Sequence, residues 1–500
     1  ATIVCAQIPE PVAVDGGRIT GASSRDPAIR AFKGIPFAAP PTGELRWKAP
    51  QPVRSWEAVR AASEFAADCP QLRDSVKTAR QMPQQSEDCL YLNIWTGAKS
   101  PGERRPVMVW IYGGGFRGGS TALAAYDGTA LAGRDVVFVS IAYRVGALGF
   151  LAHPELSHES SRRVSGNYGL LDQIAALGWV RRNIAAFGGD PDRITVFGQS
   201  AGSMSASYLA TSPLATGLFH RLIGQTGAGF GVLAPRPLAV AERKGAEFAA
   251  GLGAASLSAL RRIDAARIVE AAGTVSGVFQ PNDDGWVVPG NLALTYRERR
   301  QNDVAMLIGS NADESGTDTT QNLERFRSEL RSQFAADAAA IEKLHPASSD
   351  VEARAAARRV STITLGDYTM QRWARAQAET GTAPVYLYRF TQSPPIPREQ
   401  FPGGPEAPPP GAWHGAEIPY ALGNLASQDW PWTDKDKQLS QVMISYWINF
   451  ARSGDPNGSG LPRWPAWKET SQELMELASN PRLIPQPDRA TIEILRNHID

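Results

Sequence analysis

One serine in this chain lies where its hydroxyl could act as a nucleophile. Ser200 stands between Gly198 and Gly202 in FGQSAGS, directly after the apolar run 194–197. If that run is a strand ending in a sharp turn into a helix, glycines on both sides let neighbouring backbone pass close to the serine. The hydroxyl would then be exposed, with the first N–H groups of the helix facing the group that it attacks. The alternative is an ordinary, tightly packed turn of small residues.

A serine nucleophile needs a base within hydrogen-bond reach, and the base needs an acid to orient it. In folds that use this turn, the chain order is serine, then Asp or Glu, then histidine. Of the six histidines, only His345, His414 and His498 follow a plausible acid. His345 ends an alanine-rich helical stretch, and His498 is third from the end of the chain. Elimination therefore favours His414, in the loop after the expected strand 385–390.

Two neighbouring carboxylates compete for the role of the acid. Asp313 and Glu314 both lie in GSNADESG, residues 309–316, after an expected strand. Either one could instead cap a turn, and the residues alone leave the choice open.

A glycine-rich stretch, YGGGF at residues 112–116, could donate hydrogen bonds to a developing alkoxide. Because glycine has no Cβ, nothing blocks the approach of an oxygen to these N–H groups. The N–H of Ala201 would be a further donor. One such donor is worth roughly 10²–10³ in rate. The alternative is a glycine-rich turn without function.

Short apolar runs that end in polar or glycine-rich loops alternate with amphipathic stretches along the chain. This alternation predicts an α/β fold with a mostly parallel central sheet, helices on both faces and a site beyond the carboxyl ends of the strands. No linker divides the chain, so we expect one domain over residues 1–500, with the proline-rich stretch 393–415 as a long ordered loop over the site. The expected strands are 107–112, 136–143, 194–197, 304–310 and 385–390, and the expected helices are 168–186, 321–344, 351–379 and 434–453.

Composition excludes several classes of partner. The 500 residues carry 51 basic and 50 acidic side chains. The chain therefore has no excess of positive charge that would favour binding to nucleic acid. No apolar run approaches the length of a membrane span. We expect a small-molecule substrate, no cofactor and no metal; the oligomeric state is left open.

The three cysteines bear on the compartment. A disulfide between Cys69 and Cys89 would close a loop of about 20 residues and stabilise the fold by ~3 kcal/mol; the alternative is two unrelated thiols, and Cys5 is spare. A disulfide indicates an oxidising compartment. The first residues, ATIVCAQ, are consistent with the end of a cleaved signal peptide, so we expect a periplasmic or secreted protein.

Seven stretches together resemble the type-B carboxylesterases, including the bacterial carboxylesterases, of the α/β-hydrolase fold. The resemblance implies long insertions at the carboxyl ends of the strands. It also implies Ser200 as nucleophile, Glu314 as acid, His414 as base, Gly114, Gly115 and Ala201 as oxyanion donors, and a Cys69–Cys89 disulfide, with Thr226 supporting the acid. The stretches are FKGIPFAAPPTGELRW (32–47), EDCLYLNIW (87–95), VMVWIYGGGF (107–116), 166–203, NADESG (311–316), HGAEIPYALGN (414–424) and YWINFARSGDPN (446–457).

Two departures from the cholinesterases in this family concern the substrate. Gln199 replaces the glutamate that precedes their nucleophile, and residues 70–88 lack the aromatic side chain with which they stack a quaternary ammonium. That loop instead carries Arg73, Lys77 and Arg80, and Arg117 follows the glycine-rich stretch. Each can be a solvated surface charge; together they favour an acidic, polycarboxylic acyl group of the fumonisin type.

We therefore expect a carboxylic-ester hydrolase with a Ser-His-Glu triad and a covalent acyl-enzyme. The alternatives are a lipase, amidase or thioesterase with the same triad, or a non-catalytic binding protein of the same fold. The polar loop 69–89 disfavours long-chain triglycerides, and the filled catalytic positions disfavour the binding protein.

Overall fold

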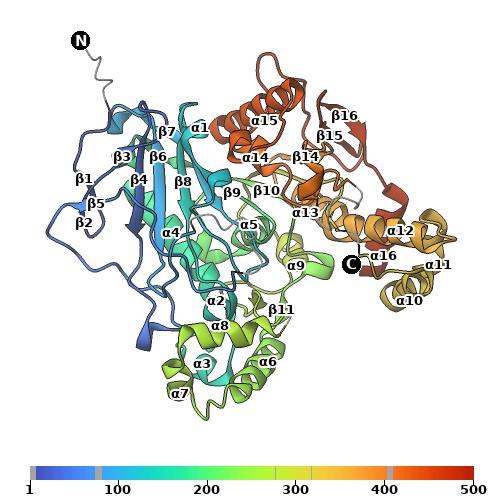
Figure 1. The fold of residues 1–500 in the computed structure, drawn as a ribbon, viewed down its shortest axis with the longest axis horizontal. Coiled ribbons are helices and arrows are strands. Elements are labelled where there is room, and N and C mark those ends of the chain that lie inside the picture. The colour runs from blue at the N-terminus through green and yellow to red at the C-terminus, as the bar shows by residue number, and fades with distance from the viewer. Residues whose placement is uncertain (1–6, 74–81, 276, 317, 402–408, 500) are drawn as a thin grey trace.

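A large twisted sheet forms the centre of the molecule (Figure 1). The computed structural model describes residues 7–73, 82–275, 277–316, 318–401 and 409–499. Within these ranges the sheet has eleven strands in the order β16-β15-β14-β13-β10-β9-β7-β8-β6-β4-β3. Their bounds are β3 Ala22–Ser23, β4 Arg30–Pro36, β6 Tyr91–Thr96, β7 Arg105–Ile111, β8 Val137–Ile141, β9 Gly189–Gln199, β10 Arg221–Gln225, β13 Ala305–Asn311, β14 Val385–Phe390, β15 Glu473–Leu477 and β16 Arg482–Pro485.

The strands from β8 to β15 run parallel, and antiparallel neighbours close the sheet at its two ends. Strands β8 and β14 are buried along their whole length. Parallel strands covered on both faces have continuous apolar sequences, which is why these runs stand out in the chain. The predicted mostly parallel sheet is confirmed. Outside it, β1 Val12–Val14, β2 Gly17–Thr20 and β5 Arg60–Ala61 form a small sheet, and β11 Arg236–Pro237 pairs with β12 Asn282–Asp283.

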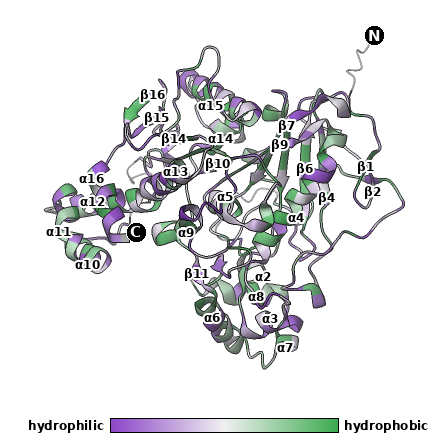
Figure 2. Ribbon diagram, turned by 180° about the vertical axis from the view of Figure 1, so that it is seen from behind, coloured by the Kyte–Doolittle hydropathy of each residue, from purple (hydrophilic) through white to green (hydrophobic). Residues whose placement is uncertain are grey.

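Helices pack on the sheet and extend beyond it. Helix α5 contacts β7, β9 and β10, and α15 contacts β7 and β9. Figure 2 shows hydrophilic and hydrophobic residues alternating along α15, as expected of a helix with one buried face. The helices are α1 Thr129–Ala132, α2 Gly146–Phe150, α3 Pro154–Glu159, α4 Tyr168–Asn183, α5 Ala201–Thr211, α6 Leu238–Gly251, α7 Leu257–Arg262, α8 Ala265–Gly273, α9 Leu292–Arg297, α10 Leu323–Phe334, α11 Ala338–Leu344, α12 Asp350–Thr362, α13 Tyr368–Thr380, α14 Ile418–Ala421, α15 Asp434–Ser453 and α16 Arg489–Ile499.

Most predicted elements are present with small shifts of their ends, and two helices differ. The predicted helix 321–344 is wrong as a single element, because Ala335 has a φ of 43° and separates α10 from α11. The predicted helix 351–379 contains a π-helical segment, η8 Ile363–Asp367, between α12 and α13. The predicted strand 385–390 and helix 434–453 have the same ends as β14 and α15.

The buried apolar side chains of the described residues form two clusters. The larger one surrounds the central sheet and includes residues from nearly every strand of it. The smaller one joins α10, α11, α12 and α16, with Phe326, Ile341, Val360 and Leu495 among its buried side chains. Figure 1 shows these helices projecting to one side of the sheet. They form a unit with a core of its own.

A disulfide joins Cys69 and Cys89. Residues 74–81, which include Lys77 and Arg80, and residue Cys5 lie outside the described residues, as does the part 402–408 of the predicted loop over the site. Among the described helices, none combines the length and apolar character that crossing a bilayer requires.

Candidate active site

Ser200 lies in a strained turn between β9 and α5. Its backbone has φ 58° and ψ −124°, a combination that costs an L residue of order 1–3 kcal/mol. The Ser200 N–H donates to the carbonyl oxygen of Gln225 at 2.9 Å, which ties the turn to the neighbouring strand β10. The strand–turn–helix context that the motif requires is therefore present.

The two glycines of the motif are required by close backbone contacts. A Cβ on Gly202 would lie 2.0 Å from the carbonyl oxygen of Ile111 in β7, and one on Gly198 would lie 2.6 Å from the same oxygen. No side chain fits at either position unless the turn moves away from β7. This close approach places the serine beside the end of β7, where the glycine-rich stretch begins.

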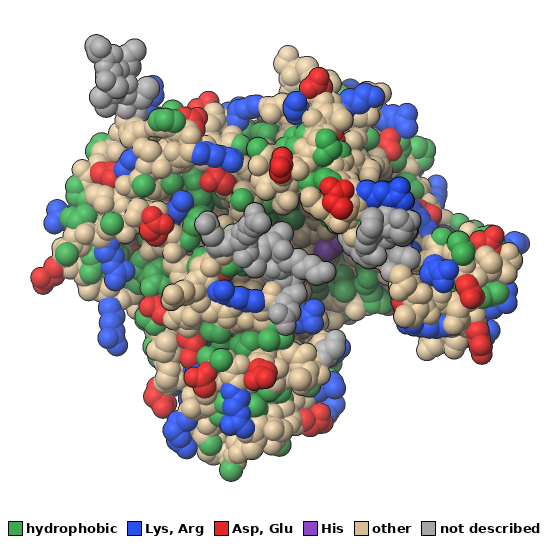
Figure 3. All heavy atoms as spheres, in the orientation of Figure 1, with side chains coloured by type: hydrophobic (Ala, Val, Ile, Leu, Met, Phe, Trp, Pro, Cys, Tyr) green, Lys and Arg blue, Asp and Glu red, His purple; other side chains and the backbone are tan. Residues whose placement is uncertain are grey.

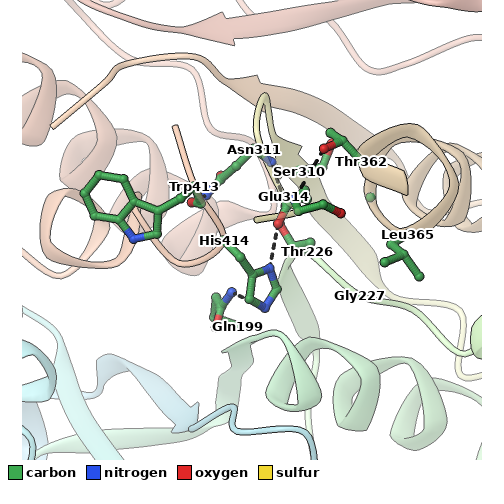
Figure 4. Close-up of polar contacts among 12 residues, drawn as sticks. Gln199, Thr226, Gly227, Ser310, Asn311, Glu314, Thr362, Leu365, Trp413 and His414 are labelled. Atoms are coloured by element: carbon green, nitrogen blue, oxygen red, sulfur yellow. Dashed lines mark hydrogen bonds and ion pairs between the residues drawn. The ribbon is translucent and has the colours of Figure 1, made fainter. Parts of the chain in front are cut away.

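His414 and Glu314 meet at the carboxyl ends of β13 and β14 (Figure 4). Nδ1 of His414 lies 2.6 Å from Oε2 of Glu314. The other carboxylate oxygen accepts from the hydroxyl of Thr226 at 2.6 Å and from the backbone N–H of Asn311 at 2.5 Å. The side chain of Glu314 is 2% exposed, so these donors stabilise a carboxylate that has little contact with water.

Asp313, the competing acid, points elsewhere. Its Oδ2 accepts from the backbone N–H of Ala412 at 2.9 Å, and its Oδ1 lies 3.3 Å from a guanidinium nitrogen of Arg358. In this arrangement Asp313 holds the segment that precedes His414, whereas Glu314 contacts the imidazole itself.

The second nitrogen of His414 contacts Gln199 in this structure. Because Nδ1 donates to Glu314, Nε2 of the neutral ring is an acceptor, and the amide nitrogen of Gln199 lies 3.2 Å from it. Among the described residues, no hydrogen bond joins Ser200 to His414. Gln199 directly precedes the serine in the chain. Its side-chain amide contacts the imidazole nitrogen to which a serine hydroxyl would donate its hydrogen bond.

The environment of His414 favours the charged imidazole. Partial burial lowers its pKa, but the charge and hydrogen bond of Glu314 and the charge of Glu417 outweigh this effect, so the pKa lies above its ordinary value. The side chain is 42% exposed. Figure 3 shows a hollow in this face of the molecule with a histidine side chain inside it. A substrate therefore has access to the ring from solvent.

Glu417 is a buried carboxyl beneath the site that the sequence interpretation did not single out. It accepts from the side-chain amides of Gln225 at 3.1 Å and Asn311 at 2.5 Å. Burial, and then the charge of Glu314, raise its pKa. Asn311 thus donates to both carboxyl groups, through its backbone to Glu314 and through its side chain to Glu417. A glutamate three residues after the candidate base was the only sign of it in the sequence.

The glycine-rich stretch lies beside the nucleophile. A Cβ on Gly113 would be 2.9 Å from the Cβ of Ser200, and Gly114 and Gly115, both solvent-exposed, have φ values of 111° and 62°. Ala201 is the first residue of α5, where a backbone N–H has no partner within the helix. The expected oxyanion donors therefore flank the serine.

Arg117 is exposed near the same glycines. Its Nε would lie 3.9 Å from a Cβ on Gly115, and it lines a cavity of about 260 Å³ with Leu72, Gly146 and Phe279. Within the described ranges no carboxylate pairs with Arg117. Asp127, ten positions further along the chain, lies 3.4 Å from Arg25. Arg73 donates to the carbonyl oxygen of Pro83.

No cluster of three or more potential metal ligands occurs in the part of the chain that the structure describes.

Several known proteins that are similar to this chain are named as esterases. The profile of the carboxylesterase family matches residues 9–494. The fumonisin B1 esterase of Sphingopyxis macrogoltabida is 38% identical, over 95% of this chain and 88% of that protein. The para-nitrobenzyl esterase of Bacillus subtilis is 35% identical, over 93% of this chain and 94% of that protein.

Solved structures agree with the sequence relatives. A para-nitrobenzyl esterase structure has a TM-score of 0.85 and 33% identity and covers 98% of this chain and 99% of its own, so the fold is the α/β-hydrolase fold. Sequence, fold and the strained serine turn lead to one classification. The chain belongs to the carboxylesterase family and is an enzyme of that class, a serine hydrolase of carboxylic esters.

Proposed function

We propose that Ser200, His414 and Glu314 form the catalytic triad of this esterase and that hydrolysis proceeds through a covalent acyl-enzyme. The observation that carries the proposal is the 2.6 Å contact between His414 and Glu314 beside the strained turn of Ser200. The carboxylate fixes the tautomer in which Nε2 carries no proton, which is the form that accepts one.

In the proposed reaction, His414 first exchanges its contact with Gln199 for one with the hydroxyl of Ser200. The serine oxygen attacks the ester carbon as its proton passes to Nε2 of His414, and the N–H groups of Gly114, Gly115 and Ala201 hold the oxyanion. The imidazolium then gives that proton to the departing alcohol, which leaves an acyl-serine. Water, deprotonated by His414, releases the acid and restores the serine.

We further propose that the acyl group carries a carboxylate, which Arg117 binds. The exposed guanidinium near the oxyanion glycines, without a carboxylate partner in the described chain, supports this. So does the 38% identical relative whose name gives fumonisin B1 as its ester. A charge-assisted hydrogen bond of this kind is worth about 1.5–3 kcal/mol, or roughly 10- to 150-fold in kcat/KM.

We also propose that the protein functions in an oxidising compartment, as a periplasmic or secreted enzyme. The disulfide between Cys69 and Cys89 supports this, because disulfides persist mainly outside the reducing cytosol.

The triad is tested with two variants and a matched control. Ser200→Ala should lower kcat for p-nitrophenyl acetate by up to roughly 10⁶-fold, because a triad acts as a unit. Glu314→Gln should lose far more activity than Asp313→Asn, which changes the adjacent carboxylate. A Ser200→Ala enzyme with a tenth of the wild-type rate, or the reverse ranking of the two acids, would contradict the assignment.

Arg117→Ala tests the acyl group. The kcat/KM for a succinyl-type ester should fall roughly 10- to 150-fold, while that for a butyryl ester of the same alcohol serves as the control. The informative quantity is the ratio of the two values in wild type and variant. An unchanged ratio would show that the arginine does not bind the substrate's carboxylate.

A further inference from the structure

A buried glutamine joins the segment that follows Cys69 to the glycine-rich stretch. Gln71 is 6% exposed, and its side-chain amide pairs with the backbone of Gly119. The Gly119 N–H donates to Oε1 of Gln71 at 2.7 Å, and Nε2 of Gln71 donates to the carbonyl oxygen of Gly119 at 2.8 Å. The amide thus binds both polar groups of one residue, as a paired residue in an antiparallel sheet does. This pairing fixes both the position and the orientation of that backbone.

Gln71 is itself held in place from the other side. Its Nε2 also donates to the carbonyl oxygen of Cys69 at 3.0 Å, and its backbone N–H donates to Oε1 of Gln85 at 3.1 Å. Cys69 is in turn bonded to Cys89. A primary amide has two N–H donors, and both of those in Gln71 are engaged within the protein. None is left to bind a substrate.

The backbone that Gln71 holds packs directly against the proposed oxyanion donors. A Cβ on Gly118 would lie 2.6 Å from Oε1 of Gln71, and a Cβ on Gly114 would lie 2.1 Å from the carbonyl oxygen of Gly118. A Cβ on Gly119 would likewise lie 2.9 Å from the carbonyl oxygen of Gly113. Because these segments are in contact without space between them, a shift of Gly118 and Gly119 displaces Gly114.

The proposed donors cannot anchor themselves. Gly114 and Gly115 have φ values of 111° and 62° and carry no side chains, and glycine loses more conformational freedom than any other residue when it is fixed. Donors to an oxyanion stabilise the transition state only when they are already in place before the reaction. A donor segment made of glycines therefore needs an anchor outside itself, and the contacts of Gln71 supply one.

We propose that Gln71 is a positioning residue for ester hydrolysis, which holds the glycine-rich stretch so that the N–H groups of Gly114 and Gly115 point at the developing oxyanion. This inference rests on the proposed function of those two glycines. Gln71 acts through the backbone of Gly119 and not through the substrate. Its loss should therefore weaken the binding of the transition state and leave the binding of the ester in its ground state unchanged.

The test replaces Gln71 with methionine, which preserves the length of the side chain and removes its hydrogen bonds. Acylation and deacylation both pass through an oxyanion, so Gln71→Met should lower kcat and kcat/KM for p-nitrophenyl acetate together, with an unchanged KM. We expect a loss of at least about tenfold; removing one donor outright costs roughly 10²–10³ in rate, and here the N–H groups remain but are less well directed. Rates are expressed per active site, counted by labelling Ser200 with a fluorophosphonate, so that misfolded enzyme does not contribute.

Gln84→Ala is the matched control. Gln84 is an exposed glutamine of the same disulfide-closed loop, and it contacts Asp68 through its backbone carbonyl, which the substitution leaves in place. This variant should retain the wild-type kcat and KM.

Inhibition by a trifluoromethyl ketone measures the oxyanion site independently. Ser200 adds to the carbonyl carbon of this inhibitor, the serine proton passes to His414, and the carbonyl oxygen becomes a stable oxyanion that resembles the transition state. Gln71→Met should raise the inhibition constant by the same factor by which it lowers kcat/KM. If Gln71→Met does not give folded enzyme, Gln71→Asn, whose amide is one methylene too short, takes its place with the same expected losses.

Two results would overturn the inference and leave the triad standing. One is a wild-type kcat/KM and inhibition constant in the Gln71 variant, and the other is a raised KM with an unchanged kcat, which would assign Gln71 to substrate binding. Wild-type activity of Ser200→Ala would instead overturn the proposed function.

Discussion

At the scale of single residues, Glu417 raises the pKa of His414, the proposed base, from beneath the site. It has no cation among its hydrogen-bond partners, which are the neutral amides of Gln225 and Asn311. Its charge raises the pKa of His414, after the larger contribution of Glu314. A nearby negative charge favours the protonated imidazole, and only the neutral imidazole accepts the serine proton.

Glu417→Gln should therefore lower the pKa of His414 and move the acid limb of the kcat/KM profile to lower pH. The sign follows because the neutral base then persists to more acidic solution. Asp313→Asn is the control, since Asp313 pairs with Arg358 and is not among the groups that shift His414. An acid limb that moves to higher pH, or that moves equally in both variants, would contradict this role.

Some residues of the site could be predicted from the sequence and others could not, because only some of them depend on their neighbours in the chain. The turn around Ser200 depends on its immediate neighbours, so its motif was sufficient. Asp313 and Glu314 are adjacent, and only the tertiary fold directs one to Ala412 and the other to His414. Gln199 contacts a histidine 215 positions away, a relation that no local pattern encodes.

At the scale of elements, the π-helical segment η8 shapes the space around Glu314, the proposed acid. Its Gly366 packs so closely that a Cβ there would lie 2.8 Å from Cγ of Glu314, and Asp367 accepts from the hydroxyl of Ser310 at 2.7 Å. Such π-helical turns occur frequently at functional sites. The helical periodicity continues through the segment, so the sequence predicted one helix over 351–379. The strands were easier to predict, because their buried apolar runs end at polar loops.

At the scale of the whole molecule, the described part of the chain has one hydrophobic cluster around the central sheet and a smaller one among α10, α11, α12 and α16. The expectation of a single domain over residues 1–500 stays a prediction. What the sequence could not indicate is a cavity of about 740 Å³ where the smaller cluster meets the body, because its walls come from segments more than a hundred residues apart in the chain, such as Val232 and Val360. Cavities of this kind depend on how helices are placed and not on their amphipathic patterns.

The disulfide between Cys69 and Cys89 closes a loop, and its contribution can be measured on the whole molecule. Cys69 and Cys89 are 20 positions apart, and constraining a loop of about that length in the unfolded chain is worth ~3 kcal/mol. Replacing both cysteines with alanine should lower the free energy of unfolding in urea by about that amount, while Cys5→Ala should not. Non-reducing mass spectrometry of the protein from an oxidising compartment should find the two peptides joined and Cys5 free. Free thiols at both positions would remove the support for export, and an unchanged free energy of unfolding would show that the loop is already constrained without the bond.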